Sequence, residues 1–345
     1  MTNTIQSTAA PRTQNASARA VQWGIAFSLA FTALIWTAGG RLDDIRLLPD
    51  TGATWYWKLP EPTFWTRATA WCFYALHQVS RWGLICYAQT RVKRYTPGLH
   101  RVNWIALGMN TFFIVLHFIQ THLWYDGLAK DVSIWSSQAS VALLLVAILL
   151  MENQRRGLFF GRKAPISKQI SRFVRQYHGY VFAWATVYTF WYHPMVNTSG
   201  HLIGFLYVFL LMLQGSLFFT RIHVNKWWTF AQEIIVLFHG ALVALMQGNQ
   251  LWPMFFFGFA GIFLITQMHS LGLKRWQKLG FLALYVGGAP WVYSSRGSVQ
   301  LNETIRIPLI EYLAVAVLAG LTGGGLWFAR RVKGLAGSNV HEAAS

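Results

Sequence analysis

The sequence predicts an all-α, polytopic integral membrane protein, a bundle of transmembrane helices. Hydrophobic residues make up 54% of the 345-residue chain, and charged residues make up only 12%, whereas a soluble domain has about 25%. Apolar runs long enough to cross a bilayer recur along the whole chain. The 18 Trp and 13 Tyr residues are typical of a protein with an aromatic belt at each membrane surface. No polar stretch is long enough to fold as a separate soluble domain.

Hydropathy predicts ten spans within a transmembrane helical domain at residues 20–331. The first 19 residues are rich in Ser, Thr, Ala and Asn and are expected to form a disordered cytoplasmic tail, with a second such tail at 332–345. The expected spans are residues 20–38, 64–89, 102–124, 133–151, 174–195, 201–220, 228–247, 252–269, 276–294 and 308–329.

The basic residues predict the orientation of these spans. With both termini inside, 21 of the 29 basic residues lie in or beside inner segments and seven in outer ones, which is the positive-inside pattern. The net charge of +18 is therefore a topology signal and a surface for anionic lipid. The expected partner is the lipid bilayer, with no nucleic acid, and the expected location is a bacterial inner (plasma) membrane.

The two cysteines exclude several redox centres. Cys72 and Cys86 lie on one expected helix about 21 Å apart, so they cannot form a disulfide with each other. The chain has no Cys-x-x-Cys-His motif, which excludes a covalently attached c-type haem. It also lacks the cysteines for an iron–sulfur cluster.

Histidine is the most informative residue type at membrane depth, because an ionisable side chain in hydrocarbon usually faces a cavity, a partner or a cofactor. Ten of the eleven histidines fall within or at the ends of spans two to eight. The three deepest and most suggestive are His77, His117 and His239. The others lie at the inner edge (His100, His178, His223, His269) or at the outer edge (His122, His193, His201), where many histidines are only interfacial side chains.

The favoured hypothesis is a b-type cytochrome-like electron-transfer protein or oxidoreductase. Residues 172–195 form one expected helix that carries His178 and His193. Fifteen residues place them about 22 Å apart and within roughly 60° of the same face, so they suit two stacked haem b groups as metal ligands. The expected second ligands are His100 or His223 inside, and His117, His122 or His239 outside. His117 is also a candidate metal ligand.

This helix resembles those of the ferric-reductase type, in which paired histidines recur at about this separation on one helix. The resemblance covers one or two spans. It implies electron transfer through bis-histidine haem. The flavin and nicotinamide domain of those proteins is absent here, so a quinone or a redox partner subunit is the expected source of electrons.

The first alternative is a membrane-embedded enzyme that modifies lipids or acyl groups. Its candidate catalytic residues are His77, Arg81, Glu233 and His239. His77 and Arg81 are four residues apart and share a helix face, so a histidine base would lie beside a cation for an anionic group. An arginine that extends to the inner surface would explain Arg81 equally well.

Arg67 and His77 resemble the Arg and His that integral-membrane sugar acyltransferases carry about eleven residues apart on their first helix. Here the spacing is ten and the helix is the second. Glu233, six residues before His239, would relay a proton or bond a neighbouring helix. We also expect Asp126 to orient His122, four residues earlier. A transporter is the second alternative, with broken helices near the midplane.

Two short segments are similar to each other. Arg156-Gly-Leu-Phe-Phe-Gly-Arg162 follows the fourth span, and Gly215-Ser-Leu-Phe-Phe-Thr-Arg221 ends the sixth. A duplicated helical pair or two similar exits from the bilayer would each explain the likeness.

Overall fold

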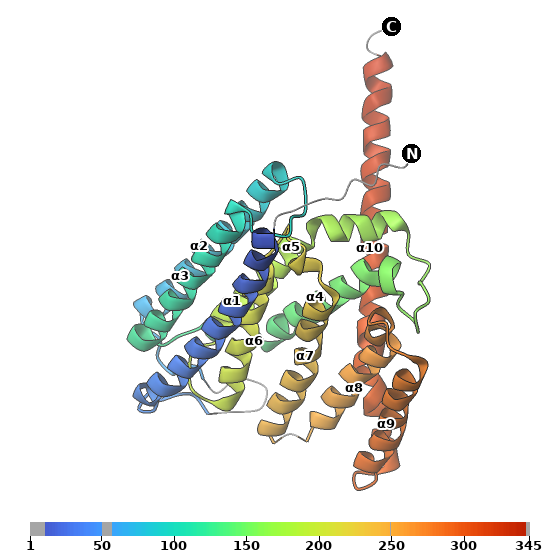
Figure 1. The fold of residues 1–345 in the computed structure, drawn as a ribbon. Coiled ribbons are helices and arrows are strands. Elements are labelled where there is room, and N and C mark those ends of the chain that lie inside the picture. Colours follow the sequence, from blue (N-terminus) through green and yellow to red (C-terminus); the bar gives the residue numbers. More distant parts are fainter. Residues whose placement is uncertain (1–10, 50–56, 249, 343–345) are drawn as a thin grey trace. The chain divides into compact units, whose positions relative to one another are not determined.

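The computed structural model describes residues 11–49, 57–248 and 250–342, and in that part of the chain it contains ten α-helices and no β-strand (Figure 1). The prediction of an all-α fold is therefore confirmed. The helices are α1 (Pro11–Ala38), α2 (Phe64–Arg91), α3 (Arg101–Trp124), α4 (Ile134–Arg156), α5 (Lys168–Tyr192), α6 (Ser199–Ser216), α7 (Lys226–Met246), α8 (Trp252–Ile265), α9 (Arg275–Tyr293) and α10 (Glu303–Glu342).

Seven stretches of the described chain are long and apolar enough to cross a membrane, which supports a multi-pass membrane protein. Helices α2, α5 and α9 are not among them, because each carries several charged or polar side chains. The seven are residues 16–42, 101–124, 134–156, 199–216, 226–246, 252–270 and 298–332.

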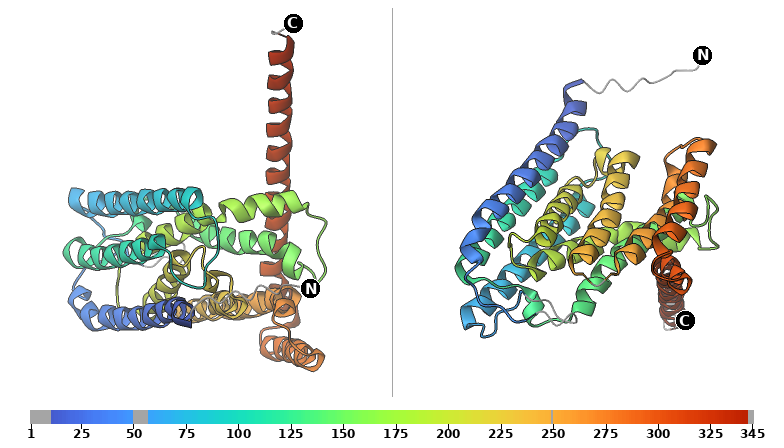
Figure 2. Two further views of the ribbon diagram at one scale, coloured as in Figure 1. Left: turned by 45° about the horizontal axis from the view of Figure 1, so that its top comes forward. Right: turned by 90° about the horizontal axis from the view of Figure 1, so that it is seen from below.

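The first and last helices are longer than the sequence predicts. Helix α1 begins at Pro11 and α10 continues to Glu342, so helix covers residues 11–19 and most of 332–345, where composition predicts disordered tails. In Figure 2 the C-terminal part of α10 runs on past α8 and α9. Residues 1–10 and 343–345 lie outside the described residues, as does segment 50–56 of the outer loop.

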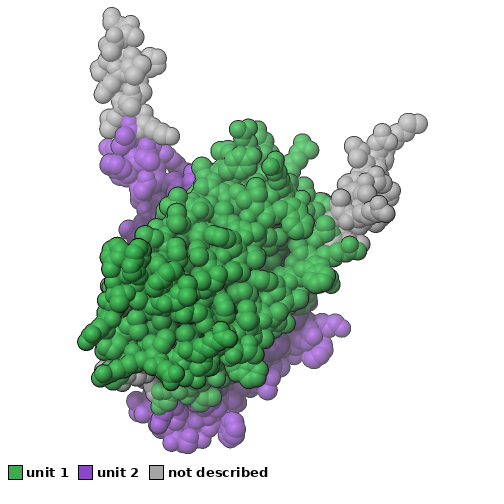
Figure 3. All heavy atoms as spheres, turned by 90° about the vertical axis from the view of Figure 1, so that its left-hand side faces the viewer, with its two compact units in different colours: residues 1–141, 179–249 green, residues 142–178, 250–345 purple. Residues whose placement is uncertain are grey.

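The chain divides into two compact units, where the sequence predicts one transmembrane domain. Unit 1 comprises residues 1–141 and 179–249, and unit 2 comprises residues 142–178 and 250–345 (Figure 3).

Unit 1 is built from helices that pair side by side, α1 with α6, α2 with α3, and α6 with α7. Its core is aromatic. The Phe31 ring meets Phe118 and Phe209 edge to face, at centroid distances of 5.6 Å and 5.7 Å. Edge-to-face pairs are the favoured geometry for buried rings. Phe190 and Trp191 at the end of α5 are fully buried in the same core.

Unit 2 has an almost purely aliphatic and aromatic core around α8, which packs against α9 and α10. A Cβ added at Gly258 would lie 2.8 Å from the Ile307 side chain, so glycine is what permits the close approach of α8 and α10. Pro308 lies inside α10, which begins at Glu303, five residues before the expected start of this span. Val146, Leu149, Ile262 and Val315 fill the centre.

The two similar segments adopt the same kind of turn. Phe160 has φ 50° and Phe219 has φ 58°, a left-handed conformation that is uncommon for a bulky residue. The leucine two positions earlier is buried in both, Leu158 and Leu217. The shared letters thus correspond to a shared backbone turn, one in each unit.

Candidate functional site

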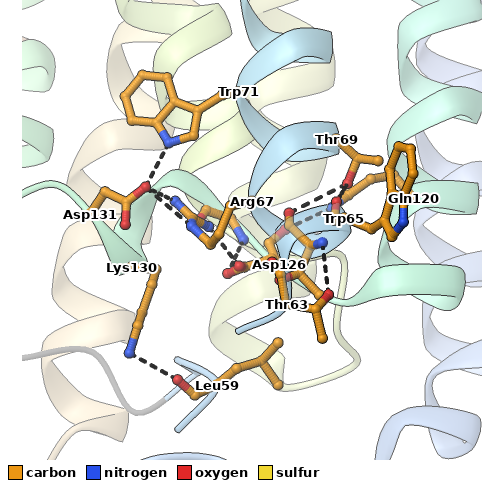
Figure 4. Close-up of polar contacts among 12 residues, drawn as sticks. Leu59, Thr63, Trp65, Arg67, Thr69, Trp71, Gln120, Asp126, Lys130 and Asp131 are labelled. Carbon is orange, nitrogen blue, oxygen red and sulfur yellow. Dashed lines mark hydrogen bonds and ion pairs between the residues drawn. The ribbon is translucent and has the colours of Figure 1, made fainter. Parts of the chain in front are cut away.

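The N-terminal end of α2 is fixed by an ion-pair cluster around Arg67 (Figure 4). The Arg67 guanidinium donates from Nη1 to Asp126 Oδ2 at 2.6 Å and from Nε to Asp131 Oδ2 at 3.1 Å. Trp71 Nε1 donates to the same Asp131 oxygen at 2.6 Å. Lys130 donates to a backbone carbonyl of the segment before α2. The cluster joins α2 to the loop between α3 and α4, and we assign it a structural role.

The two carboxylates of this cluster differ in environment. Burial raises the pKa of Asp126, against the effect of its hydrogen bond from Arg67. Burial acts in the same direction on Asp131, but hydrogen bonds from Arg67 and Trp71 outweigh it and lower the pKa of Asp131. The expected pairing of Asp126 with His122 is wrong. The His122 Nδ1 lies 2.8 Å from the carbonyl of Phe118 in its own helix, because Arg67 already occupies Asp126.

Two outer-edge histidines, His193 and His201, meet in the structure. Their ring centroids are 5.5 Å apart, and the Trp57 ring contacts both, at 4.9 Å and 4.6 Å. His193 Nδ1 lies 3.1 Å from the carbonyl of Thr189, and His201 Nδ1 lies 2.7 Å from the Thr198 hydroxyl. These bonds hold both rings in place and direct each Nε2 away from its own helix.

His77 is at the centre of a buried hydrogen-bond chain that joins four helices. Trp191 Nε1 of α5 donates to His77 Nδ1 at 3.2 Å, so His77 is protonated on Nε2 and donates to Asn110 Oδ1 of α3, also at 3.2 Å. The Asn110 amide then donates to the Ser216 hydroxyl at 2.8 Å and to the Met212 carbonyl at 3.1 Å, both of α6. The His77 imidazole also stacks on Phe113 at 4.1 Å. Both of its ring nitrogens are thus occupied.

His117 is equally enclosed, with no exposed surface. Its Nδ1 lies 3.0 Å from Gln120 Oε1 and its Nε2 lies 2.8 Å from the backbone carbonyl of His193. Either nitrogen would have to give up a protein partner before it could ligate a metal. His117 therefore ties α3 to His193, the residue that follows α5.

Arg81 lies one turn beyond His77 on α2, and its side chain is buried within unit 1. It is 4% exposed, so the alternative of an arginine that extends to the inner surface is wrong. Its Nη2 donates to the Gly215 carbonyl at 3.0 Å. Its Nη1 is buried with no hydrogen-bond partner, and no carboxylate of the described residues lies within ion-pair distance. A Cβ at Gly215 would lie 3.0 Å from Nη2, so glycine leaves room for the guanidinium.

Gln78 adds a second unsatisfied polar group next to Arg81. It is 5% exposed, and neither its amide nitrogen nor its oxygen has a hydrogen-bond partner. Residues three apart on a helix are neighbours on its surface, so both side chains lie on the buried face of α2. The Arg81 site, which we define as Arg81, Gln78 and Gly215, therefore offers buried donors without acceptors.

The other candidate residues are dispersed. His178 Nδ1 lies 2.7 Å from the carbonyl of Arg175 in unit 2, His100 bonds the Thr96 hydroxyl, and His223 bonds the Gln214 carbonyl. His239 faces α6, where a Cβ at Gly204 would lie 3.5 Å from its ring, and its Nδ1 has no hydrogen-bond partner. Glu233 lies on the same helix, α7. Within the described residues no three His, Cys, Asp or Glu side chains are grouped to hold a metal ion.

The buried polar residues that sequence reasoning missed include Gln78, Asn110 and Glu311. For Glu311 the signal was present, because an acid within an apolar run is as unusual as a histidine there. For Gln78 and Asn110 it was weaker, since amides are tolerated in spans at small cost. Cys72 and Cys86 form no disulfide with each other, as their separation predicts, and both are exposed.

Comparisons with known proteins gave no match. No protein-family model, no curated protein and no solved structure is similar to this chain at a significant level.

Proposed function

We propose that this protein binds the anionic group of a membrane-soluble substrate, a fatty carboxylate or a lipid phosphate, at the Arg81 site inside unit 1. The observation that carries the proposal is the Arg81 guanidinium, buried without a carboxylate partner and with Nη1 unpaired. The proposal belongs to the class of lipid- or acyl-handling membrane proteins.

The energetic argument rests on the cost of a buried charge. An uncompensated ion in an apolar interior costs several kcal/mol, and arginine stays protonated where other groups neutralise. A planar guanidinium matches a carboxylate or phosphate through two parallel hydrogen bonds. An anion placed at Nη1 would also accept from the Gln78 amide, so one ligand would satisfy both unpaired side chains.

His77 would position this site and would not be its base. Its Nδ1 lone pair already accepts from Trp191, so it cannot take a proton from a substrate without breaking that bond. Through Asn110 it fixes Ser216, the neighbour of Gly215, whose carbonyl holds Arg81. The proposal therefore concerns binding, and enzymatic acyl chemistry would need a further group from the substrate or from water.

We further propose that all ten helices span the inner membrane of a bacterium with both termini inside. Exposed tryptophans support this, because they lie near both ends of the helices, as interfacial belts do. Trp65 is the second residue of α2, and α9 carries Trp276 near its start and Trp291 near its end. Two helices outside the seven strongly apolar stretches therefore have tryptophans suited to an interface.

The test uses pairs of ligands that differ only in charge. Thermal unfolding of the detergent-solubilised protein is followed with hexadecanoate against hexadecanol, and with phosphatidate against diacylglycerol. A ligand at one hundred times its Kd stabilises the folded state by about 2.7 kcal/mol. We expect the anionic member of at least one pair to raise Tm, and Arg81→Gln to abolish that rise.

The matched control is Arg101→Gln, which removes an exposed arginine at the start of α3 and should leave the ligand response unchanged. Equal shifts with the charged and uncharged members of both pairs, or a full response in the Arg81→Gln protein, would contradict the proposal.

The second candidate is a b-type haem between His193 and His201, whose rings converge in unit 1. Trp57 contacts both rings, so this side chain would have to move to admit a porphyrin. If haem is bound, the purified protein will show a Soret band and a reduced α-band, both lost in His193→Ala. A colourless, iron-free preparation rules this candidate out.

A further inference from the structure

Helix α10 carries a carboxyl group that the function proposed above does not use. Glu311 is 6% exposed and its Oε2 is buried with no hydrogen-bond partner. It lies in the stretch 298–332, one of the seven apolar enough to span a membrane. No basic side chain of the described residues lies within ion-pair distance of it.

The surroundings of Glu311 are apolar because of the helix that faces it. The buried stripe of α10 runs through Thr304, Pro308, Glu311 and Val315. Its members contact α8, where Pro308 lies near Gly261 and Val315 packs with Ile262. The α8 sequence WPMFFFGFAGIFLI has no ionisable side chain, so nothing on that helix can compensate a charge on Glu311.

The titratable groups on the other elements near Glu311 interact with other partners. The Tyr312 hydroxyl lies 2.6 Å from the Thr266 hydroxyl and donates to the Leu158 carbonyl at 3.0 Å. Arg156 at the end of α4 interacts with Tyr312 electrostatically. The α9 group near this crossing is the Tyr285 hydroxyl, 3.3 Å from a Cβ at Gly261. None of them makes a hydrogen bond or ion pair with the Glu311 carboxyl.

Glu303, two turns earlier on α10, is a buried acid whose charge is compensated by neighbouring cations. Its carboxylate lies 3.7 Å from both Arg296 and Arg306, and it accepts a hydrogen bond from the Tyr293 hydroxyl at 3.1 Å. It is as buried as Glu311. The two acids thus share a helix and a degree of burial, and differ in whether cations meet them.

We propose that Glu311 is an intramembrane proton-binding site, a carboxylic acid that holds its proton at neutral pH, whereas Glu303 is held by two arginines. An unpaired carboxylate in an apolar interior is disfavoured strongly enough that the group takes up a proton instead. The protonated acid needs one acceptor for its hydrogen. Pro308 has no N–H, so the Thr304 carbonyl on the same buried stripe lacks the hydrogen bond that a regular α-helix would give it and is a candidate acceptor.

The test is infrared difference spectroscopy at neutral pH of the wild-type protein against Glu311→Gln. We expect the variant to lose the carbonyl stretching band of a protonated carboxylic acid, and the control variant Glu303→Gln to keep that band. Loss of carboxylate bands in the Glu311→Gln protein would overturn the proposal.

A second measurement needs no substitution. Dicyclohexylcarbodiimide is apolar and reacts only with protonated carboxyl groups. We expect peptide mass spectrometry of the labelled wild-type protein to find the adduct on Glu311 and not on Glu303, with a yield that falls as pH rises. Labelling of Glu303 in preference to Glu311 would overturn the assignment. The failure of this proposal would not affect the Arg81 site, which lies in unit 1.

Discussion

The two units bury polar groups in opposite ways. In unit 1 a connected hydrogen-bond chain runs from Trp191 through His77 and Asn110 to Ser216, and the Arg81 site next to it has unpaired groups. In unit 2 an apolar helix, α8, faces Glu311, a buried acid that pairs with no cation of the described residues. A satisfied network specifies how its helices pack, whereas an isolated polar group costs stability and is retained for another reason.

The ion-pair cluster should give the largest loss of stability. Arg67→Leu leaves the Asp126 carboxylate, 2% exposed, buried without its cation. Removal of one partner of such a pair costs about 3 kcal/mol, which thermal unfolding in detergent will detect. Arg67→Leu combined with Asp126→Leu should cost less than the sum of the two single changes. Simple additivity would show that the pair is not coupled.

The second largest loss of stability is expected at Asn110, in the middle of the unit 1 hydrogen-bond chain. Asn110→Leu removes the partner of His77 and of Ser216 at once, so we expect a loss of about 2 kcal/mol, given that interhelical hydrogen bonds in membranes are individually modest. Unfolding by denaturing detergent measures it. Unchanged stability in the Asn110→Leu protein would mean that this hydrogen-bond chain does not hold the helices together.

In unit 2 we expect a substitution at a buried polar residue to raise stability instead of lowering it. Glu311→Leu replaces an uncompensated acid by an apolar side chain of similar size, and should stabilise the protein by about 1 kcal/mol. Glu303→Leu is the matched control and should destabilise it, because Arg296 and Arg306 lose their partner. An equal loss of stability in both variants would contradict the proposed difference between an uncompensated Glu311 and an ion-paired Glu303.

The smallest expected effect is the pH dependence of stability that the ion-pair cluster around Arg67 contributes. The folded pKa of Asp131 lies below its ordinary value of 3.8, so its contribution is complete above that value and is lost as pH falls through the folded pKa. Asp126 acts in the opposite sense, because burial raises its pKa and protonation then favours the folded state. We expect Asp131→Asn to reduce the acid sensitivity of Tm. An unchanged acid limb would show that Asp131 does not contribute.

The positions of the helices could be predicted from sequence with good accuracy, since each of the ten expected spans overlaps one α-helix. The sites could be predicted only in part. His77 and Arg81 were identified as a pair on one face, and both are buried together. Their partners Asn110 and Gly215 could not be predicted, because these residues belong to other helices and a single sequence does not show which helices are in contact.

Histidine spacing shows the same limit. The sequence predicts one helix through both His178 and His193, but α5 ends at Tyr192 and His193 is the residue after it. The two histidines also belong to different compact units, and the ring that meets His193 is His201, which sequence had placed only at the outer edge.

The sequence by itself determined that this chain is a helical membrane protein, because hydropathy and the requirement for internal backbone hydrogen bonds act along the chain, residue by residue. Only the tertiary structure decided which polar groups are satisfied. Partner choice depends on contacts between helices far apart in sequence. For this reason Arg67 is paired and His77 is enclosed, whereas Arg81 and Glu311 have no counter-ion among the described residues.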